Sequence, residues 1–194
     1  MNKLKTFLLA LLIIVSCQSE KEGTTTSVAQ IITPQGEMFF SLSDQTPNHK
    51  DHFIKLARAD YWDSLTFNRV IGNFVIQGGC PDTPAGFTDP NYLIAPEFTD
   101  SLQHIYGALG MGRDDNPDKN SAICQFYIVH NKKGLPRLDG DYMIFGQLIK
   151  GWEVLEKLGN VPTDSLDTPL NPIALDVNIL QLTEFELSEK DIEL

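Results

Sequence analysis

The chain has 194 residues, of which 42% are hydrophobic and 21% charged, and these values are typical of a globular protein with a single domain. Its formal net charge is −11, which disfavours nucleic acid as a partner because phosphate and an acidic surface repel each other. No apolar run is long enough to cross a membrane as a helix, which needs about 20 residues.

The N-terminal segment 1–16 has the pattern of a signal peptide, in which lysines precede the apolar run Phe7–Val15. Ser16 before Cys17 resembles the lipobox of bacterial lipoproteins, and a polar run follows the cysteine. We therefore expect cleavage before Cys17, a lipid on this residue and a flexible tether over residues 17–27. An ordinary signal peptide cleaved nearby is the alternative. The protein would be lipid-anchored in the cell envelope, on the periplasmic face of the outer membrane or at the cell surface.

The globular domain is predicted to span residues 28–187, before an acidic tail at 188–194 that we expect to be frayed. Its first two strands are Val28–Thr33 and Glu37–Leu42, because both runs are rich in strand formers. Pro34-Gln35-Gly36 between them has turn chemistry, so the two strands should form a β-hairpin.

A helix is predicted after the hairpin, with Thr46 as its cap and Pro47 at its first position. Helical spacing places three apolar residues on one face: Phe53, Leu56 and Ala57. His49 and His52 are expected on the solvated face. No second pair of ligands accompanies these histidines, so no metal site is predicted. The sequence shows neither a phosphate loop nor a Rossmann fingerprint, so no cofactor is predicted.

The most informative stretch is Phe67–Gly79, with the sequence FNRVIGNFVIQGG. It predicts two strand pieces joined by a turn at Gly72-Asn73. Two polar side chains, Arg69 and Gln77, stand within this apolar run. A charge there is costly unless it faces a cleft, and an edge-strand arginine pointing into water is the alternative.

Further elements are predicted towards the C-terminus. The tip Asp114–Ser121 should be a solvated acidic loop, and the alternation in Gln125–His130 predicts a strand whose terminal histidine we interpret as incidental. Trp152–Leu158 predicts a short amphipathic helix with Trp152 towards the core. Ile173–Leu182 predicts a final strand that closes the sheet.

Five segments carry a family resemblance and occur in the family's order: Phe67–Gly79, Gly107–Arg113, Gln125–Ile128, Leu138–Gly140 and Ile144–Gly146. They resemble the motifs of the cyclophilins, the peptidyl-prolyl cis-trans isomerases, and the resemblance covers roughly Val28 to Leu182. It implies a mainly β fold, a closed eight-stranded antiparallel barrel capped by two α-helices. It also implies an enzyme that accelerates rotation about X–Pro bonds without a metal or cofactor. The substrates would be unfolded or exported polypeptides that contain proline.

The resemblance also implies roles for single residues. Arg69 would donate a hydrogen bond to the prolyl nitrogen, and Gln77 and Phe74 would complete the catalytic group. Gln77 would hold Arg69 and contact the substrate backbone. Arginine suits this role because its guanidinium stays charged and holds five donors in one plane. The substrate groove would be lined by further residues: Val75, Gly112, Arg113, Gln125, Tyr127, Leu138 and Tyr142. Backbone groups near Gly112 and Arg113 would pair with the substrate as an extended strand does.

Two departures from the family pattern affect this groove. Tyr127 replaces the pocket phenylalanine, so its hydroxyl must reach water or a partner. Arg137 stands where eukaryotic members carry the tryptophan important for cyclosporin, so we expect weak or no binding of that drug. We expect a monomer. A non-catalytic peptide-binding chaperone module that uses the same groove is the alternative function, and a structural envelope lipoprotein is the third.

Cysteine is sparse. Apart from Cys17, the chain has Cys80 and Cys124. By the resemblance both lie beside glutamines of the groove, namely Gln77 and Gln125. A disulfide and two separate thiols both remain open, because the sequence does not supply the geometry of a bridge.

Overall fold

The computed structural model describes residues 24–63, 65–80, 93–122 and 124–194. The predicted signal peptide, the predicted lipidation site Cys17 and most of the predicted tether lie outside the described residues. Within the described ranges, no helix combines the length and the apolar character that crossing a membrane requires.

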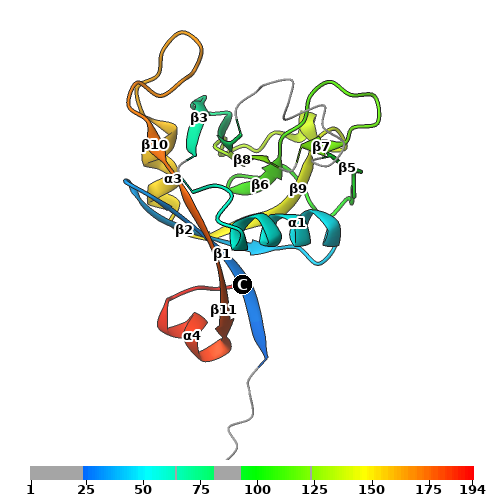
Figure 1. Cartoon of the computed structure of the whole chain (residues 1–194), viewed down its shortest axis with the longest axis vertical. Coiled ribbons are helices and arrows are strands. Elements are labelled where there is room, and N and C mark those ends of the chain that lie inside the picture. Colours follow the sequence, from blue (N-terminus) through cyan, green and yellow to red (C-terminus); the bar gives the residue numbers. More distant parts are fainter. Residues whose placement is uncertain (1–23, 64, 81–92, 123) are drawn as a thin grey trace, which may run out of the picture.

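A single antiparallel sheet forms the body of the domain, with the strand order β10-β3-β4-β8-β6-β9-β2-β1-β11 (Figure 1). Its strands are β1 (Thr25–Thr33), β2 (Gly36–Leu42), β3 (Thr66–Val70), β4 (Val75–Gly79), β6 (Ala108–Met111), β8 (Gln125–Val129), β9 (Met143–Lys150), β10 (Ile173–Ala174) and β11 (Asp176–Thr183). Leu175 alone separates β10 from β11, which pair with β3 and β1 at the two ends of the order. Both ends of the sheet therefore meet in one chain segment. Counted as one strand, this segment completes the predicted eight-stranded barrel.

The predicted N-terminal hairpin is confirmed, and its first strand is longer than expected. β1 starts at Thr25 rather than at Val28, and Thr25 pairs with Thr183 of β11. The end of the predicted tether therefore belongs to the barrel. Thr33 pairs with Gly36 at the hairpin turn, where Gly36 has φ +132°, a conformation that favours glycine.

The predicted helix is α1 (Pro47–Arg58), but a distant residue caps its N-terminus. Thr46 makes no side-chain cap hydrogen bond. Instead, the Glu97 carboxylate accepts the backbone N–H of Asn48 over 3.1 Å and that of His49 over 3.0 Å. A negative charge at this end also complements the helix dipole.

His49 is fully buried, so the prediction that it lies on a solvated face was wrong. Its Nδ1 lies 2.6 Å from Glu97 Oε2, and its Nε2 lies 3.0 Å from Ser121 Oγ. Burial lowers the pKa of His49 despite the neighbouring Glu97. The neutral ring thus donates through Nδ1 and accepts the Ser121 hydroxyl through Nε2. It joins α1 to a small second sheet of β5 (Leu93–Ile94) and β7 (Ser121–Ala122).

The predicted C-terminal helix is α3 (Trp152–Gly159), with Leu155 and Leu158 in the core. Trp152 does not face the core as predicted, because its position is 39% exposed. Its ring stacks on Tyr106 at 5.4 Å between centroids. The indole therefore covers a neighbouring loop rather than filling the barrel.

A third described helix, α4 (Glu184–Glu189), was not predicted. Thr183 and Glu186 form a capping box at its start, in which each side chain accepts the other's backbone N–H. Leu187 and Ile192 are buried in a cluster with residues of β1, β2 and β11. The C-terminal tail is therefore packed on the barrel at Ile192 rather than frayed as expected.

Alternate residues of the central strands enter two different apolar layers. Phe126 and Ile128 of β8 point into the main core, whereas Tyr127 and Val129 belong to a second cluster on the outer face. This confirms the predicted alternation. The outer cluster contains most of the residues predicted to line the substrate groove.

Candidate active site

Five residues lie opposite one another across five neighbouring strands. Arg69 of β3 pairs with Gln77 of β4, Gln77 with Tyr127 of β8, Tyr127 with Gly110 of β6, and Gly110 with Ile144 of β9. Opposed residues of an antiparallel pair have Cβ atoms about 5 Å apart and lie on the same face. The outer face of the barrel therefore carries a polar end, Arg69 and Gln77, next to an apolar end.

Arg69 has partners on two sides. Its Nη1 donates to Gln77 Oε1 over 3.4 Å, and its Nε lies 3.9 Å from Asp167 Oδ2. The arginine side chain is 39% exposed, so the charge stays hydrated while its direction is restrained. A guanidinium has five N–H donors, so these contacts leave it able to serve a substrate. The predicted contact between Arg69 and Gln77 is present.

The turn that carries Phe74 is held by the residue after β8. Asn73 has φ +58°, as the predicted turn at Gly72-Asn73 requires. The backbone N–H of Asn73 donates to His130 Nδ1 over 3.2 Å, and the His130 N–H donates to the Phe74 carbonyl over 2.8 Å. His130 is buried, and burial lowers its pKa, so the neutral ring accepts the Asn73 N–H. His130 was predicted to be incidental rather than an acid–base residue; the structure gives it a supporting role, because its hydrogen bonds position Phe74.

An apolar cluster from several strands and loops lies on the same face as Arg69, where the resemblance implies the proline pocket, and we refer to this cluster as the pocket. Its buried members are Val75, Ala108, Tyr127, Val129, Leu135, Leu138 and Ile144, and Phe74, Leu102 and Tyr142 pack against them. Leu138 comes from the short 3-10 helix η2 (Pro136–Leu138). Arg137 of the same turn lies over the Phe74 ring, 4.9 Å from its centroid. The structure thus brings together Phe74, Val75, Tyr127, Leu138 and Tyr142, as the resemblance implies.

The Tyr127 hydroxyl has a buried partner that the sequence did not reveal. Its oxygen lies 2.7 Å from His104 Nε2, and His104 Nδ1 lies 2.6 Å from Asp139 Oδ1. The same Asp139 oxygen accepts the His104 backbone N–H over 2.9 Å. Asp139 is therefore the acceptor towards Nδ1, which leaves Nε2 to accept the Tyr127 hydroxyl proton.

Burial keeps this chain of groups in one protonation state. It lowers the pKa of His104 although Asp139 opposes the shift, and it raises the pKa of Tyr127 well above the ordinary value. The imidazole is therefore neutral and the phenol is protonated. Since the Tyr127 proton points to His104, the pocket presents the tyrosine as an apolar ring.

Gly110 provides the room for that ring. A Cβ atom at this position would lie 2.3 Å from Tyr127 Cζ and 2.5 Å from its hydroxyl oxygen, so a side chain here would force the ring to shift. The absence of a side chain at Gly110 therefore lets the Tyr127 ring lie against β6.

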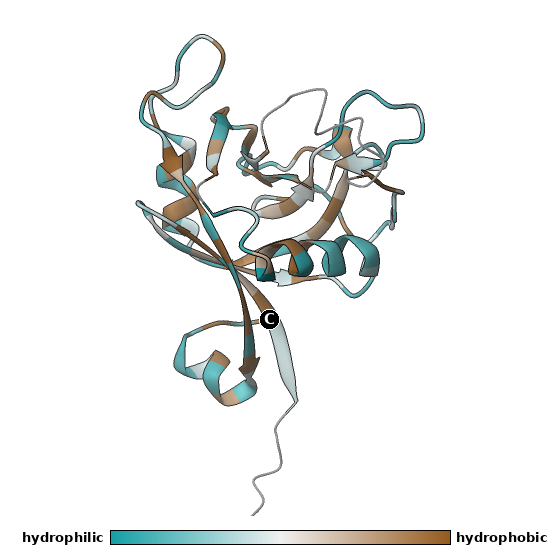
Figure 2. Ribbon diagram, in the orientation of Figure 1, coloured by the Kyte–Doolittle hydropathy of each residue, from teal (hydrophilic) through white to brown (hydrophobic). Residues whose placement is uncertain are grey.

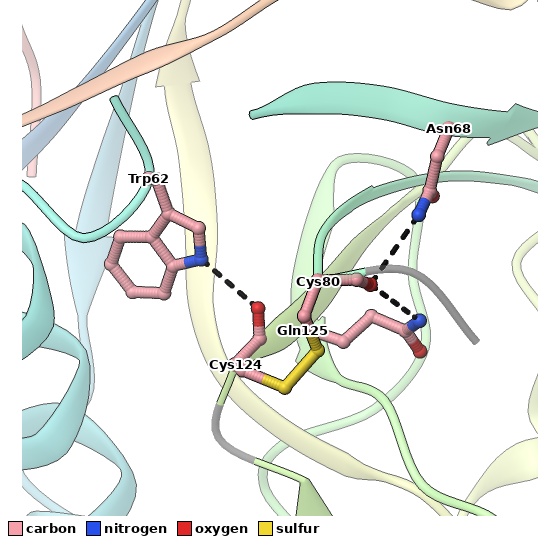
Figure 3. The surroundings of a disulfide bond; sticks show 5 residues. All are labelled: Trp62, Asn68, Cys80, Cys124 and Gln125. Atoms are coloured by element: carbon pink, nitrogen blue, oxygen red, sulfur yellow. Dashed lines mark hydrogen bonds between the residues drawn. A yellow bond between two sulfur atoms is a disulfide. The ribbon is translucent and has the colours of Figure 1, made fainter. Parts of the chain in front are cut away.

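Gln125 and the two remaining cysteines meet at one end of the groove. Cys80 and Cys124 form a disulfide with Cα atoms 5.4 Å apart, which settles the question that the sequence left open (Figure 3). The Cys80 carbonyl accepts Gln125 Nε2 over 3.2 Å and Asn68 Nδ2 over 3.3 Å, and the Cys124 carbonyl accepts Trp62 Nε1 over 3.1 Å. The bridge thus anchors the backbone that orients Gln125.

The predicted backbone contacts at Gly112 and Arg113 are only partly open to a substrate. The Gly112 N–H donates to the Gln125 carbonyl, and the Gly112 carbonyl accepts the Ala122 N–H. The Arg113 Nε donates to the Asp141 carbonyl over 2.7 Å, and its guanidinium lies 4.6 Å from the centroid of the Tyr142 ring. Arg113 therefore closes the rim of the pocket over Tyr142, and pairing of its backbone with a substrate stays a prediction.

The acidic loop Asp114–Ser121 is tied across the same rim. Lys119 Nζ lies 2.7 Å from Asp141 Oδ1 and donates to the Gly140 carbonyl over 2.8 Å. The loop was expected to be solvated throughout, but Ser121 is buried against His49. The described residues contain no cluster of three or more His, Cys, Asp or Glu side chains that could hold a metal ion.

Sequence reasoning missed the residues that support the site from behind. His104 and Asp139 hold Tyr127, His130 holds the Phe74 turn, and Asp167 flanks Arg69. Only Asp139 stood within a quoted motif, Leu138–Gly140, and nothing in that motif indicates its partner. The other contacts join segments far apart in the chain, so no local pattern indicates them.

Comparisons with known proteins agree with this geometry. A family model described as "Cyclophilin type peptidyl-prolyl cis-trans isomerase/CLD" matches residues 28–181. Peptidyl-prolyl cis-trans isomerase ppi1 of Schizosaccharomyces pombe is 33% identical over 151 residues, covering 75% of this chain and 94% of that protein. Peptidyl-prolyl cis-trans isomerase-like 2 of Gibberella zeae is 32% identical over 174 residues. That match covers 88% of this chain but only 29% of the longer relative.

Solved structures lead to the same family. A cyclophilin type peptidyl-prolyl cis-trans isomerase of Cryptosporidium parvum, crystallised in the presence of the dipeptide Ala-Pro, superposes with a TM-score of 0.70 at 32% sequence identity. The match covers 79% of this chain and 98% of that chain. The resemblance carried by the motifs is therefore confirmed, and the chain belongs to the cyclophilin-type peptidyl-prolyl cis-trans isomerases.

Proposed function

We propose that this protein accelerates the cis–trans isomerisation of X–Pro bonds in exported polypeptides, with Arg69 as its central catalytic group. The observation that carries this proposal is the pairing of Arg69 with Gln77 at the edge of the apolar cluster around Tyr127. The pocket would hold the proline ring, and the guanidinium would lie beside the prolyl nitrogen.

The chemistry fits a site that has a fixed cation and needs no nucleophile. An X–Pro bond resists rotation because its nitrogen donates a lone pair into the carbonyl, and the barrier is about 18–20 kcal/mol. In the twisted transition state that lone pair is localised on nitrogen and accepts a hydrogen bond. Arg69 can donate that bond, so it would bind the twisted state better than either planar state. An acceleration of about 10⁵-fold needs about 7 kcal/mol of such preferential stabilisation.

The restraint on Arg69 matters for this role. A free arginine side chain would lose rotamer entropy on reaching the substrate, about 2 kcal/mol for a side chain of this type. Gln77 and Asp167 hold the guanidinium from two sides before the substrate arrives. The donor is therefore directed in advance, which is how a site lowers a barrier rather than merely binding its substrate.

The setting of the domain is part of the same proposal. The signal-peptide pattern and Cys17 support a lipid-anchored envelope protein, which would meet its substrates after export. The Cys80–Cys124 disulfide is compatible with an oxidising compartment. We further propose that the domain is monomeric. We also propose that it binds cyclosporin weakly, because Arg137, which lies over Phe74, stands at the position where eukaryotic relatives carry tryptophan.

The proposal is tested by NMR exchange spectroscopy of a short Ala-Pro peptide with the full-length protein. Wild-type protein should speed the exchange, and Arg69→Ala should reduce the effect at least a hundredfold because the donor is lost. Arg58→Ala is the matched control, since this exposed arginine at the end of α1 lies outside the groove. Peptide binding by the wild type without faster exchange would refute the isomerase and favour the chaperone module.

A further inference from the structure

The loop between α3 and β10, residues 160–172, is ordered by its own hydrogen bonds. Asp164 Oδ1 accepts the backbone N–H of Leu166 over 2.8 Å and that of Thr168 over 2.9 Å. Thr163 and Pro169 form an isolated β-bridge, and the loop stands out from the barrel above β10 (Figure 1). This loop therefore presents its side chains in a defined arrangement.

Two large apolar side chains of the loop face solvent. Leu166 is 77% exposed and Leu170 is 62% exposed, and the loop shows apolar stretches within a hydrophilic setting (Figure 2). A single exposed leucine is ordinary on a protein surface, but this hydrogen-bonded loop exposes two within five residues. We call Leu166 and Leu170 the loop leucines.

The loop leucines lie next to the catalytic strand. Asp167 directly follows Leu166, and its carbonyl accepts the Val70 N–H over 2.8 Å. Its carboxylate lies 3.9 Å from Arg69 Nε. Consecutive Cα atoms are about 3.8 Å apart, so the Cα atoms of Leu166 and Leu170 lie within about 4 Å and about 12 Å of the Cα atom of Asp167.

We propose that the loop leucines extend the substrate groove and bind apolar side chains of an unfolded client polypeptide that runs past Arg69. The continuity of the loop with β3 favours this occupant, because a chain whose prolyl nitrogen meets Arg69 would run close to Asp167 of the same loop. The contact is apolar and carries no pattern of donors or acceptors, so it favours hydrophobic segments of unfolded chains over a particular sequence. The inference rests on the proposed function, from which it takes the unfolded, proline-containing substrate. The binding of that substrate is measured independently of catalysis.

The test compares two double variants of the full-length protein, Leu166→Ser with Leu170→Ser, and Leu166→Met with Leu170→Met. The ligand is a reduced and carboxymethylated proline-containing protein that stays unfolded, and its affinity is measured by fluorescence anisotropy. The serine variant should bind about tenfold more weakly, equivalent to about 1.4 kcal/mol, and the methionine variant should bind as the wild type does. Phe185→Ser is the matched control, because Phe185 is 69% exposed on α4 at another end of the barrel (Figure 1).

The outcomes separate this inference from the isomerase. Equal binding by the serine variant and the wild type would overturn it, and so would equal weakening by Phe185→Ser, which would indicate non-specific adhesion. A short Ala-Pro peptide is measured in parallel by exchange spectroscopy. Leucine-dependent binding of the unfolded protein without any exchange of the peptide would refute the isomerase yet support the docking surface.

Discussion

Removing the disulfide should cost the domain a large part of its stability. Cys80 and Cys124 are separated by 44 residues, and closing a loop of that length in the unfolded chain corresponds to about 4 kcal/mol. Domains of this kind have a total free energy of unfolding of about 5–15 kcal/mol, so the bridge supplies a sizeable share. Both cysteines are buried, and alanine replaces them without introducing an unpaired polar group.

The assay is urea unfolding of the oxidised wild type and of the variant with Cys80→Ala and Cys124→Ala. With a slope of about 2 kcal/mol per molar urea, the midpoint should fall by about 2 M. The native-state rate on an Ala-Pro peptide should change less than about threefold, because Gln125 and Trp62 bond to the cysteine carbonyls and not to sulfur.

Adding dithiothreitol supplies the control for this prediction. It should lower the midpoint of the wild type towards that of the variant, and it should leave the variant unchanged. A loss of less than about 1 kcal/mol would refute the reasoning, because the 44-residue segment would then already be restrained in the unfolded chain.

Three further predictions concern buried groups of the domain. Burial lowers the pKa of His49, His104 and His130 below 6.5, so as the pH falls the unfolded chain binds protons at these residues before the folded chain does. The urea midpoint should therefore be constant above about pH 7 and decline as the pH falls below about 6. A midpoint that does not change with pH would contradict this. Tyr127→Phe leaves His104 Nε2 unpaired, so it should lower the free energy of unfolding in urea by about 1–3 kcal/mol. The exchange rate of the Ala-Pro peptide with this variant should stay within about threefold of the wild-type rate. A large loss of that rate would show that the Tyr127 hydroxyl acts on the substrate. Gly110→Ala places a methyl group against the Tyr127 ring, so it should weaken peptide binding about tenfold in a titration. It should also lower the free energy of unfolding by about 1–3 kcal/mol. Unchanged affinity would mean that the Tyr127 ring has room to move.

The fold was largely predictable because its signals are local. The alternation in β8, the turn at Gly72-Asn73 and the Pro47 start of α1 each depend on a few neighbouring residues. The capping box at Thr183 was equally local and readable, and α4 could have been predicted from it. The strand pairings that follow from such elements were accessible through the family resemblance.

The supporting side chains of the site were not predictable in the same way. Glu97 caps α1 across 49 positions of sequence, and His104 meets Tyr127 across 23. Such contacts depend on how loops return over the barrel, and no period or spacing encodes that path. His49 shows the same limit, because its helical position was right while its buried partner was unknown.

The closure of the barrel through β10 and β11 also constrains the order in which the domain folds. β11 pairs with β1 from Thr25 to Ile32, so the first strand of the domain can complete its pairing only after the last strand is available. Contacts so distant along the chain slow folding, because a large loop must close before they form. As a chain grows from its N-terminus, β1 can pair early only with β2. The barrel is therefore completed only when nearly the whole polypeptide has emerged, and until then the edge of β1 stays open to other strands.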